Sequence, residues 1–501
     1  MLADLRIPKP NQGNDESDMS RLKICLAASE LAPYAKTGGL ADASAALAAY
    51  FSEQGHDLRL LMPMYASIDE SALEISTVPE LRGMEMQIGG QTIAYDIVRV
   101  SSEAFPTPIY MLKCPALFHG KSLYGGYDEH VRFAVLSRAS IEMCQRLKFA
   151  PDIFHVHDWH TALVPVYLKS VYGWDTLFEN TRTVLTIHNI GYQGVFGNDV
   201  LADIGLESST DMLDAEDLYY GRVNFMKAGV MHADLLTTVS PSYAREILDP
   251  EYGMGLEHVL RARHGSLVGI LNGVDYGEWN PETDGLITAN YSAANLAGKE
   301  ENKKALLEEM GLEYEMERPL VGMVTRLTYQ KGIELVQQVL PGLMRSRDFS
   351  LVALGSGEYE YEQFFEGLLK EFPGRVGFYR GFNNGLAHRI EAGSDLFMMP
   401  SRYEPCGLNQ MYSLRYGTVP LVRATGGLAD SVQHFDPKTG QGTGIVFHDF
   451  DPNGLKWAMN TALDLYANRH AWKQLVHNGM EADFSWKEQG AKYIKQFQKI
   501  L

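Results

Sequence analysis

Patterns typical of buried strands alternate with helical patterns along nearly the whole chain, and this alternation constrains the fold more than any other feature. The first unit runs from the apolar stretch Arg21 to Ala28, through a glycine-containing loop, to an alanine-rich helix expected over about Leu40 to Gln54. Apolar residues in that helix recur at spacings that form one face. The next strand, LRLLMPMY, follows Gly55. This order is a βαβ unit, which implies a parallel sheet that binds ligands at the carboxyl ends of its strands.

The same pattern recurs in two sets. DIFHVH, TRTVLTIH and DLLTTVS complete the first set, and PLVGMVTR, SLVALGSG, RVGFYRG, DLFMMPSR and VPLVRATGG follow a polar connection. The sequence therefore predicts an α/β fold of two Rossmann-like doubly wound domains. We expect a flexible tail over residues 1–20, a first domain over 21–275 and a second over 276–484. A C-terminal helix over 485–501 could pack back on the first domain.

The hexapeptide TGGLAD occurs twice, at Thr37–Asp42 and at Thr425–Asp430, each time at a turn that enters an expected helix. Such an echo favours two similar half-molecules that carry the hexapeptide at equivalent points. The alternative is that the same residues form one kind of tight strand-to-helix turn in two unrelated places.

Charge and cysteine content restrict the partners and the compartment. The chain has 44 Lys and Arg residues against 63 Asp and Glu residues, a net charge of −19, which repels a phosphate backbone and argues against nucleic-acid binding. The four cysteines include no CxxC pair, so neither a disulfide framework nor a cysteine zinc site is indicated. No uncharged apolar run is long enough to span a membrane. We therefore expect a cytoplasmic protein that does not bind membranes.

Three clusters after expected strands carry candidate chemistry. Lys36 precedes two glycines, which would bring a cation and close backbone amides to a helix N-terminus, although such a pair is often only a turn. Arg326 and Lys331 could bind a diphosphate together or form a solvated basic turn. Glu404 and Cys406, in SRYEPCGLNQ, could serve binding or catalysis, and a helix cap by the glutamate is the alternative.

Two other motifs resemble metal sites. His155, His157 and His160 in HVHDWH straddle a strand end and a turn, so we expect no metal there. Asp449 and Asp451 resemble the two-acid metal motif of some sugar-nucleotide enzymes, but a proline and a helical pattern follow at once. We therefore expect Asp451 to cap a helix.

The motifs KTGGLAD, HDWHT, LTIHN, LNGVD, TRLTYQKG, PSRYEPCGLNQ and ATGGLAD occur in the order and approximate spacing seen in bacterial glycogen synthases and plant starch synthases. The chain resembles this family from Leu22 to Trp486. The resemblance implies a GT-B type glucosyltransferase, in which two Rossmann-like domains face each other across a cleft. We expect no cofactor, and we expect Arg326 and Lys331 to take the place of a metal. It also implies ADP-glucose as the donor and an α-1,4-glucan (glycogen, starch or maltooligosaccharide) as the acceptor, extended at its non-reducing end with retention of configuration.

Matching positions carry the family's site residues over to this chain. The catalytic group implied by the resemblance comprises Lys36, Asp158, His188, Arg326, Lys331 and Glu404. The implied donor site comprises Lys36, Gly39, Asp42, Asn272, Arg326, Lys331, Phe382, Glu404, Cys406, Gly407, Leu408, Thr425, Gly426 and Gly427. Asp158 and His188 are expected at the sugar and acceptor side. Asn409 stands where bacterial relatives usually have Thr, and Phe382 where some have Tyr, so polar contacts at these two positions are expected to differ.

The expected chemistry follows from the charge on the leaving ADP. Arg326, Lys331 and the amides around Gly39 and Gly427 are expected to stabilise that charge as the anomeric bond breaks. Glu404 is expected to bind glucose hydroxyls and to hold the sugar for attack from the same face. It is not assigned as a covalent nucleophile, since the sequence shows no second carboxylate placed for a two-carboxylate retaining mechanism. One rival is an α-glucan phosphorylase with pyridoxal phosphate. Another is a non-catalytic glucan-binding scaffold, which loss of the motif cations or of Glu404 would have suggested.

Overall fold

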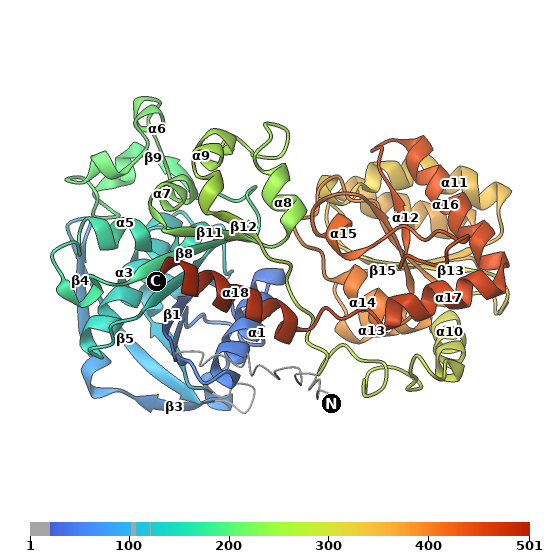
Figure 1. Cartoon of the computed structure of the whole chain (residues 1–501), viewed down its shortest axis with the longest axis horizontal. Helices are drawn as coiled ribbons and strands as arrows, with labels where there is room; N and C mark the ends of the chain where they lie inside the picture. Colours follow the sequence, from blue (N-terminus) through green and yellow to red (C-terminus); the bar gives the residue numbers. More distant parts are fainter. Residues whose placement is uncertain (1–20, 102–106, 121) are drawn as a thin grey trace, which may run out of the picture.

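The computed structural model describes residues 21–101, 107–120 and 122–501, so the tail predicted over 1–20 lies outside the described residues. Two α/β lobes lie side by side, and the chain crosses between them twice (Figure 1). Val274, in the first crossing, donates its amide to the carbonyl of Phe484, in the second, at 2.7 Å. The two crossings therefore run next to each other. The prediction of two doubly wound α/β domains is confirmed.

The first lobe is built on a ten-stranded sheet in the order β12-β11-β8-β7-β1-β2-β6-β5-β3, with β4 paired to β5. Its parallel strands are β1 (Lys23–Ala27), β2 (Asp57–Pro63), β6 (Ile109–Lys113), β7 (Ile153–His157), β8 (Arg182–Ile187), β11 (Leu235–Thr238) and β12 (Leu267–Gly269). An antiparallel extension adds β3 (Glu74–Thr77), β4 (Met84–Ile88) and β5 (Gln91–Ser101), and a separate antiparallel pair joins β9 (Val195–Gly197) to β10 (Arg222–Asn224).

The second lobe contains a six-stranded parallel sheet in the order β15-β14-β13-β16-β17-β18. Its strands are β13 (Leu320–Val324), β14 (Ser350–Gly355), β15 (Val376–Arg380), β16 (Leu396–Met399), β17 (Val419–Arg423) and β18 (Ile445–Phe447). In chain order this is the 3-2-1-4-5-6 arrangement of the Rossmann fold, whose ligands bind where the strand order reverses. That switch point lies between β13 and β16.

Helices cover both sheets. In the first lobe they are α1 (Gly39–Glu53), α2 (Pro115–Phe118), α3 (Glu129–Arg146), α4 (Asp158–Thr161), α5 (Val164–Lys169), α6 (Ala215–Tyr219), α7 (Phe225–His232), α8 (Pro241–Glu246) and α9 (Glu257–Ala262). The later helices are α10 (Ala297–Glu309), α11 (Ile333–Ser346), α12 (Tyr359–Glu371), α13 (Asn384–Gly393), α14 (Asn409–Arg415), α15 (Gly426–Ser431), α16 (Pro452–Ala467), α17 (Arg469–Met480) and α18 (Trp486–Ile500). None of the described helices is both long and apolar enough to cross a membrane.

The C-terminal helix α18 lies against α1 of the first lobe (Figure 1). The rings of Phe51 and Phe497 pack with their centroids 5.6 Å apart, and a Cβ atom at Gly490 would collide with the ring of Tyr50. The last segment of the chain therefore belongs spatially with the first lobe, while the exact domain boundaries stay a prediction.

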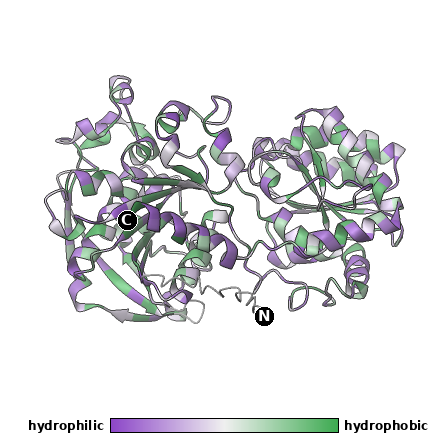
Figure 2. Cartoon of the chain, viewed as in Figure 1, coloured by the Kyte–Doolittle hydropathy of each residue, from purple (hydrophilic) through white to green (hydrophobic). Residues whose placement is uncertain are grey.

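Apolar burial explains why these strands form. All six residues of β14, SLVALG, are buried, as expected for a parallel strand covered on both faces. Figure 2 shows hydrophobic residues gathered along the strands of both lobes and hydrophilic residues on the outer helix faces. Each lobe thus has a sheet at its centre, and its loops are left free to carry polar groups.

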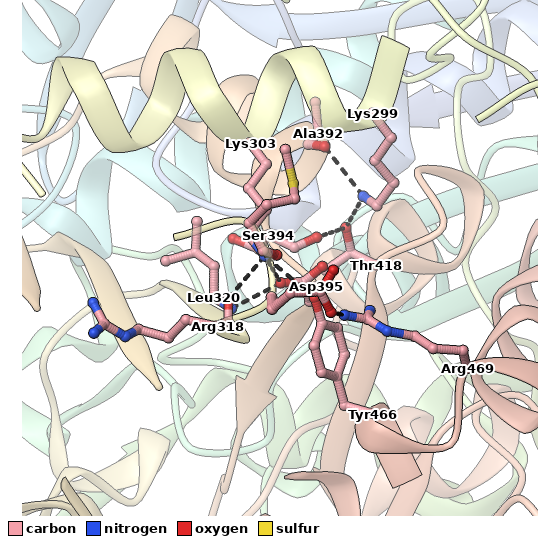
Figure 3. A network of polar contacts seen from close by, with 12 residues as sticks. Lys299, Lys303, Arg318, Leu320, Ala392, Ser394, Asp395, Thr418, Tyr466 and Arg469 are labelled. Atoms are coloured by element: carbon pink, nitrogen blue, oxygen red, sulfur yellow. Dashed lines mark hydrogen bonds and ion pairs between the residues drawn. The ribbon is translucent and has the colours of Figure 1, made fainter. Parts of the chain in front are cut away.

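Two lysines of α10, the half-buried Lys299 and the buried Lys303, fasten the connection between the lobes to the second sheet (Figure 3). Lys303 Nζ lies 2.7 Å from Asp395 Oδ2 and donates to the carbonyl oxygens of Met316 and Arg318 at 2.9 and 2.8 Å. Lys299 Nζ donates to Thr418 Oγ1 at 2.8 Å, and burial lowers the pKa of Lys299 to about 7. This network holds the second lobe beside the first crossing.

The repeated hexapeptide does not mark equivalent points in the two lobes. Its first copy begins α1 after β1, the first strand of its sheet, whereas its second copy begins α15 after β17, the fifth strand of its sheet. The expectation of equivalent positions is therefore wrong. The alternative, one kind of strand-to-helix turn used twice, describes the structure.

Candidate active site

The predicted site residues lie at the carboxyl ends of strands, and the two lobes bring these ends together. The Lys36 loop follows β1 and Asp158 follows β7, while Arg326 follows β13 and Glu404 follows β16. A Cβ atom at Gly39 would lie 3.7 Å from Leu408 Cδ1 of the other lobe, and one at Gly191 would lie 3.8 Å from Tyr403 Oη. The two strand-end edges therefore meet.

A buried carboxylate holds the first-lobe loop in place. Glu30 accepts hydrogen bonds from Thr37 N at 2.5 Å, from Thr37 Oγ1 at 2.6 Å and from Tyr124 Oη at 2.6 Å. The adjacent Lys36 Nζ lies 2.7 Å from Asp42 Oδ1, although burial raises the pKa of Asp42. Glu30 was not among the predicted site residues. The one sequence feature that could have indicated it is its position seven residues before Thr37.

The central contact of the second lobe joins the loops after β13 and β16. Lys331 Nζ lies 2.6 Å from Glu404 Oε2, which also accepts a hydrogen bond from Ser401 Oγ at 3.0 Å. Gly332 has a φ of 69°, and a Cβ atom there would collide with the carbonyl oxygen of Pro400. This close approach explains the glycine after Lys331. The Glu404 side chain binds Lys331 and Ser401. The alternative, that Glu404 caps a helix, is therefore wrong.

Two predicted donor residues are accessible at the same edge. Arg326 is exposed, and within the described residues its guanidinium forms no ion pair. Phe382, just after β15, is 84% exposed. Asn409, the departure from the bacterial pattern, donates its Nδ2 hydrogen to the carbonyl of Val324 at 2.8 Å, so it secures the end of β13.

A pocket of about 220 Å³ lies between the lobes. Its lining includes Asp42 from α1, Asn272 from the first crossing and Leu408 from the second lobe. Asn272 is 3% exposed, and its Oδ1 has no hydrogen-bond partner in the described part of the chain. Behind it lies Cys406, whose pKa is raised to about 12 by burial, so this thiol stays protonated. The pocket therefore offers a carboxylate and an unpaired amide oxygen to a polar ligand.

Asp158 and His188 lie together on the first lobe. Asp158 has a φ of 53°, and its Oδ1 accepts a hydrogen bond from His188 N at 2.7 Å. Burial raises the pKa of Asp158 to about 7 and lowers that of His188 to about 3, so His188 is neutral. The pair supplies a carboxyl group near its ionisation point and an uncharged imidazole.

The histidines of HVHDWH point to different partners. His155 Nε2 lies 2.7 Å from Thr186 Oγ1, His157 Nδ1 lies 2.9 Å from His188 Nε2, and the ring of His160 stacks on Tyr124. Residues 21–101, 107–120 and 122–501 contain no group of three or more His, Cys, Asp or Glu side chains that could hold a metal ion. These histidines are packing and hydrogen-bonding residues of the first lobe.

Thr425, Gly426 and Gly427 lie behind the Glu404 loop. The amide of Gly426 is bound by Glu246 of the first lobe at 2.8 Å, and that of Gly427 donates to the carbonyl of Glu404 at 3.0 Å. Glu246 is a second residue that the sequence analysis missed. No local pattern marks a carboxylate that meets a turn 180 residues later.

Two Rossmann-type lobes with fixed cations and a carboxylate at their shared strand-end edge define a GT-B type glycosyltransferase. Comparison with known proteins narrows this class. Residues 23–262 match the family model described as starch synthase catalytic domain, and residues 310–477 match the model described as glycosyl transferases group 1. The chain belongs to the glycogen synthase and starch synthase family, and its activity is that of a glycogen synthase.

Individual relatives align along almost the entire chain. A glycogen synthase from Koribacter versatilis is 44% identical over 490 residues, 95% of this chain and 98% of that protein. Glycogen synthase 1 from Geobacter sulfurreducens is 43% identical over 495 residues, 96% of this chain and 97% of that protein. The catalytic domain of starch synthase IV from Arabidopsis thaliana, solved with ADP and acarbose, has a TM-score of 0.88 at 34% identity and covers 96% of this chain and 99% of that one. The predicted family, fold class and enzyme class are confirmed.

Proposed function

We propose that this protein transfers glucose from ADP-glucose to the non-reducing end of an α-1,4-glucan, with release of ADP and retention of configuration. The observation that carries the proposal is the ion pair between Lys331 and Glu404 at the switch point of the second sheet, beside the exposed Arg326. The family supports it, and so does the related starch synthase IV domain, which was solved with ADP and acarbose.

The diphosphate of the donor is held by cations from both lobes. Arg326 and Lys331 come from the loop after β13, and Lys36 comes from the loop after β1. The backbone of Gly38 faces open space in the described part of the chain, which lets a phosphate approach the N-terminus of α1, next to Gly39. These fixed positive charges stabilise the ADP anion as the anomeric bond breaks.

The glucose unit lies against the carboxylates of the cleft. Glu404 Oε1 accepts no hydrogen bond from the described residues, so it is free to accept hydrogen bonds from sugar hydroxyls. Asp42 and the unpaired Oδ1 of Asn272 line the adjoining pocket, with Leu408 and Tyr412 at its second-lobe side. Asp158 and neutral His188 face the acceptor. Phe382 stacks on the adenine ring.

The protein acts in the cytoplasm. All four cysteines, each within the described residues, are free thiols and buried. Such thiols persist in a reducing compartment.

The test is a transfer assay with a maltooligosaccharide acceptor and either ADP-glucose or UDP-glucose as donor. Release of nucleotide and extension of the acceptor are measured together. We expect extension with ADP-glucose at a kcat/KM at least tenfold above that with UDP-glucose. A third arm with glucose 1-phosphate and added pyridoxal phosphate tests the phosphorylase alternative. Extension in that arm alone, or nucleotide release without extension, would contradict the proposal.

A further inference from the structure

The two lobes are joined by a reciprocal pair of carboxylate contacts between α8 and α15. Asp430, on α15, accepts hydrogen bonds from Ser242 N and Ser242 Oγ at the start of α8, both at 2.7 Å. Glu246, at the end of α8, accepts from Gly426 N at 2.8 Å and from Thr425 Oγ1 at 3.1 Å at the start of α15. Each helix thus supplies a carboxylate to the N-terminal amides of the other, where negative charge is favoured. We call Ser242, Glu246, Gly426 and Asp430 the clasp.

In the second TGG turn, Thr425 to Gly427, the backbone amides of both glycines already donate hydrogen bonds to protein atoms. Gly426 N is bound to Glu246, and Gly427 N donates to the carbonyl oxygens of Glu404 at 3.0 Å and Pro405 at 3.2 Å. Cβ atoms at these two glycines would collide with the backbone of the Glu404 loop. The glycines are therefore needed for the close approach of α15 to the back of that loop.

The first lobe also reaches the same loop directly. Ser240, two residues after β11, is buried, and its Oγ donates to the carbonyl oxygen of Pro405 at 2.7 Å. The same Oγ accepts a hydrogen bond from Tyr243 N at 3.1 Å, which caps α8. The N-terminus of α8 and the backbone beside Glu404 are thus parts of one hydrogen-bond network that spans the two lobes.

The place of the clasp in the fold gives it a mechanical role. In the view of Figure 1, α8 and α15 meet well above the two chain crossings. The crossings are the covalent links about which the lobes can move, so contacts away from them are the ones that an opening motion would break.

We propose that the clasp is the latch of the closed form, and that Glu246 and Asp430 are positioning residues for Glu404. They act through α15 and through the Pro405 carbonyl, which the docked lobe holds in place. Thr425, Gly426 and Gly427 then support the Glu404 loop and do not bind the diphosphate. The inference rests on the proposed function in one respect, that Glu404 contacts the donor sugar.

The test compares Glu246→Ala and Asp430→Ala with Glu251→Ala, which removes an exposed carboxylate from the segment after α8. We expect each clasp variant to lower kcat at least tenfold while the Kd for ADP stays within threefold of wild type. In X-ray scattering, ADP plus maltooligosaccharide should reduce the radius of gyration less than it does in wild type. Glu246→Gln keeps an oxygen that can accept from Gly426 N, so its kcat should be intermediate. Glu251→Ala should match wild type throughout.

Near-UV circular dichroism verifies that each variant is folded. If an alanine variant is not folded, the corresponding amide variant, Glu246→Gln or Asp430→Asn, replaces it. Tighter ADP binding with unchanged or higher kcat in Glu246→Ala would overturn the inference, because the carboxylate would then merely occupy a diphosphate site. Wild-type kcat and wild-type scattering in both clasp variants would also overturn it. If the wild-type enzyme itself fails to transfer glucose, the proposed function is wrong, and the scattering data alone then decide whether the clasp is a latch.

Discussion

Lys331 Nζ lies 2.6 Å from Glu404 Oε2, so the cation expected for the leaving diphosphate and the carboxylate expected for the sugar share one contact. Ser401 Oγ binds the same oxygen at 3.0 Å. Both loops start at the switch point of the second sheet, where neighbouring strands part and leave a crevice. In the proposed reaction the bond between glucose and the diphosphate breaks. The ion pair therefore joins the residue expected to bind the glucose to the residue expected to bind the diphosphate.

Substitutions of the two partners should have different kinetic effects. Glu404→Gln removes a contact that we expect to strengthen in the transition state, so kcat should fall by roughly 10²-fold or more with little change in the Kd for ADP. Lys331→Ala removes a charge that acts on the diphosphate, so it should also weaken ADP binding, by roughly tenfold. Steady-state kinetics and calorimetry with ADP measure both effects. Equal losses of ADP affinity in the two variants would contradict these separate roles.

Phe382 offers a prediction about nucleotide recognition. The ring is 84% exposed after β15, and stacking on adenine would contribute about 1 kcal/mol. Phe382→Ala should therefore weaken ADP binding by roughly fivefold. Tyr314→Ala is the matched control, because this exposed ring lies just before β13, at the opposite edge of the same sheet. Unchanged KM and kcat for ADP-glucose in Phe382→Ala would show that the ring does not contact the nucleotide.

The strands that carry the site could be predicted because their signal is local. Runs such as LVGMV and SLVALG consist almost entirely of apolar residues and glycine, and the parallel topology then places the residues that follow them at one edge. The antiparallel extension was missed. In β5 (Gln91–Ser101), for example, exposed and buried residues are mixed, so no continuous apolar run marks the strand.

Residues that act across long separations could not be predicted. Glu246 meets Gly426 180 residues later, and Ser240 meets Pro405 165 residues later. Their partners are backbone groups, which have no signature in the sequence. The repeated hexapeptide is visible in the sequence, but its second copy is held in place by contacts to backbone groups that lie far away along the chain.

The buried pair of Lys303 and Asp395 provides a prediction about stability. Lys303→Met keeps the length of the side chain but removes the cation beside Asp395, whose Oδ2 then keeps only the hydrogen bond from Leu320 N, and it takes the lysine donor away from two carbonyl oxygens (Figure 3). Removing one partner of a buried ion pair costs roughly 3–5 kcal/mol in the free energy of unfolding. Urea-induced unfolding should show this loss, and Lys304→Met, at the exposed neighbouring position, should not. Equal midpoints for the two variants would contradict the anchoring role.

Asp158 predicts a pH dependence of stability. Burial raises its pKa from 3.8 to about 7, so the folded protein keeps a proton that the unfolded chain releases over this range. Stability contributed by this group therefore falls as the pH rises from about 4 to about 7 and is constant above that. Asp158→Asn should gain stability relative to wild type over this range, by at most roughly 4 kcal/mol. Urea unfolding at several pH values measures the difference, with exposed Asp211→Asn as the control. A constant difference between pH 4 and pH 8 would contradict the raised pKa.

Turnover should not require a divalent metal. A departing diphosphate needs its charge neutralised, either by a metal held by acidic residues or by fixed cations and amides. Asp451 Oδ1 accepts a hydrogen bond from Gly454 N at 2.8 Å, so this acid caps α16 as predicted, while Arg326 stands exposed at the strand-end edge. Chelator should therefore leave activity unchanged, and Arg326→Ala should lower kcat/KM by roughly 10²-fold.

Two further variants complete this experiment. Asp451→Ala should lower stability by about 1 kcal/mol through loss of the helix cap and retain turnover. Lys370→Ala, an exposed cation on α12, controls for the general loss of positive charge from the second lobe. Activity that is abolished by chelator, restored by magnesium or manganese and lost in Asp451→Ala would assign the diphosphate to a metal held by Asp449 and Asp451. Activity that persists in chelator but is lost in Arg326→Ala assigns the diphosphate to the fixed cations.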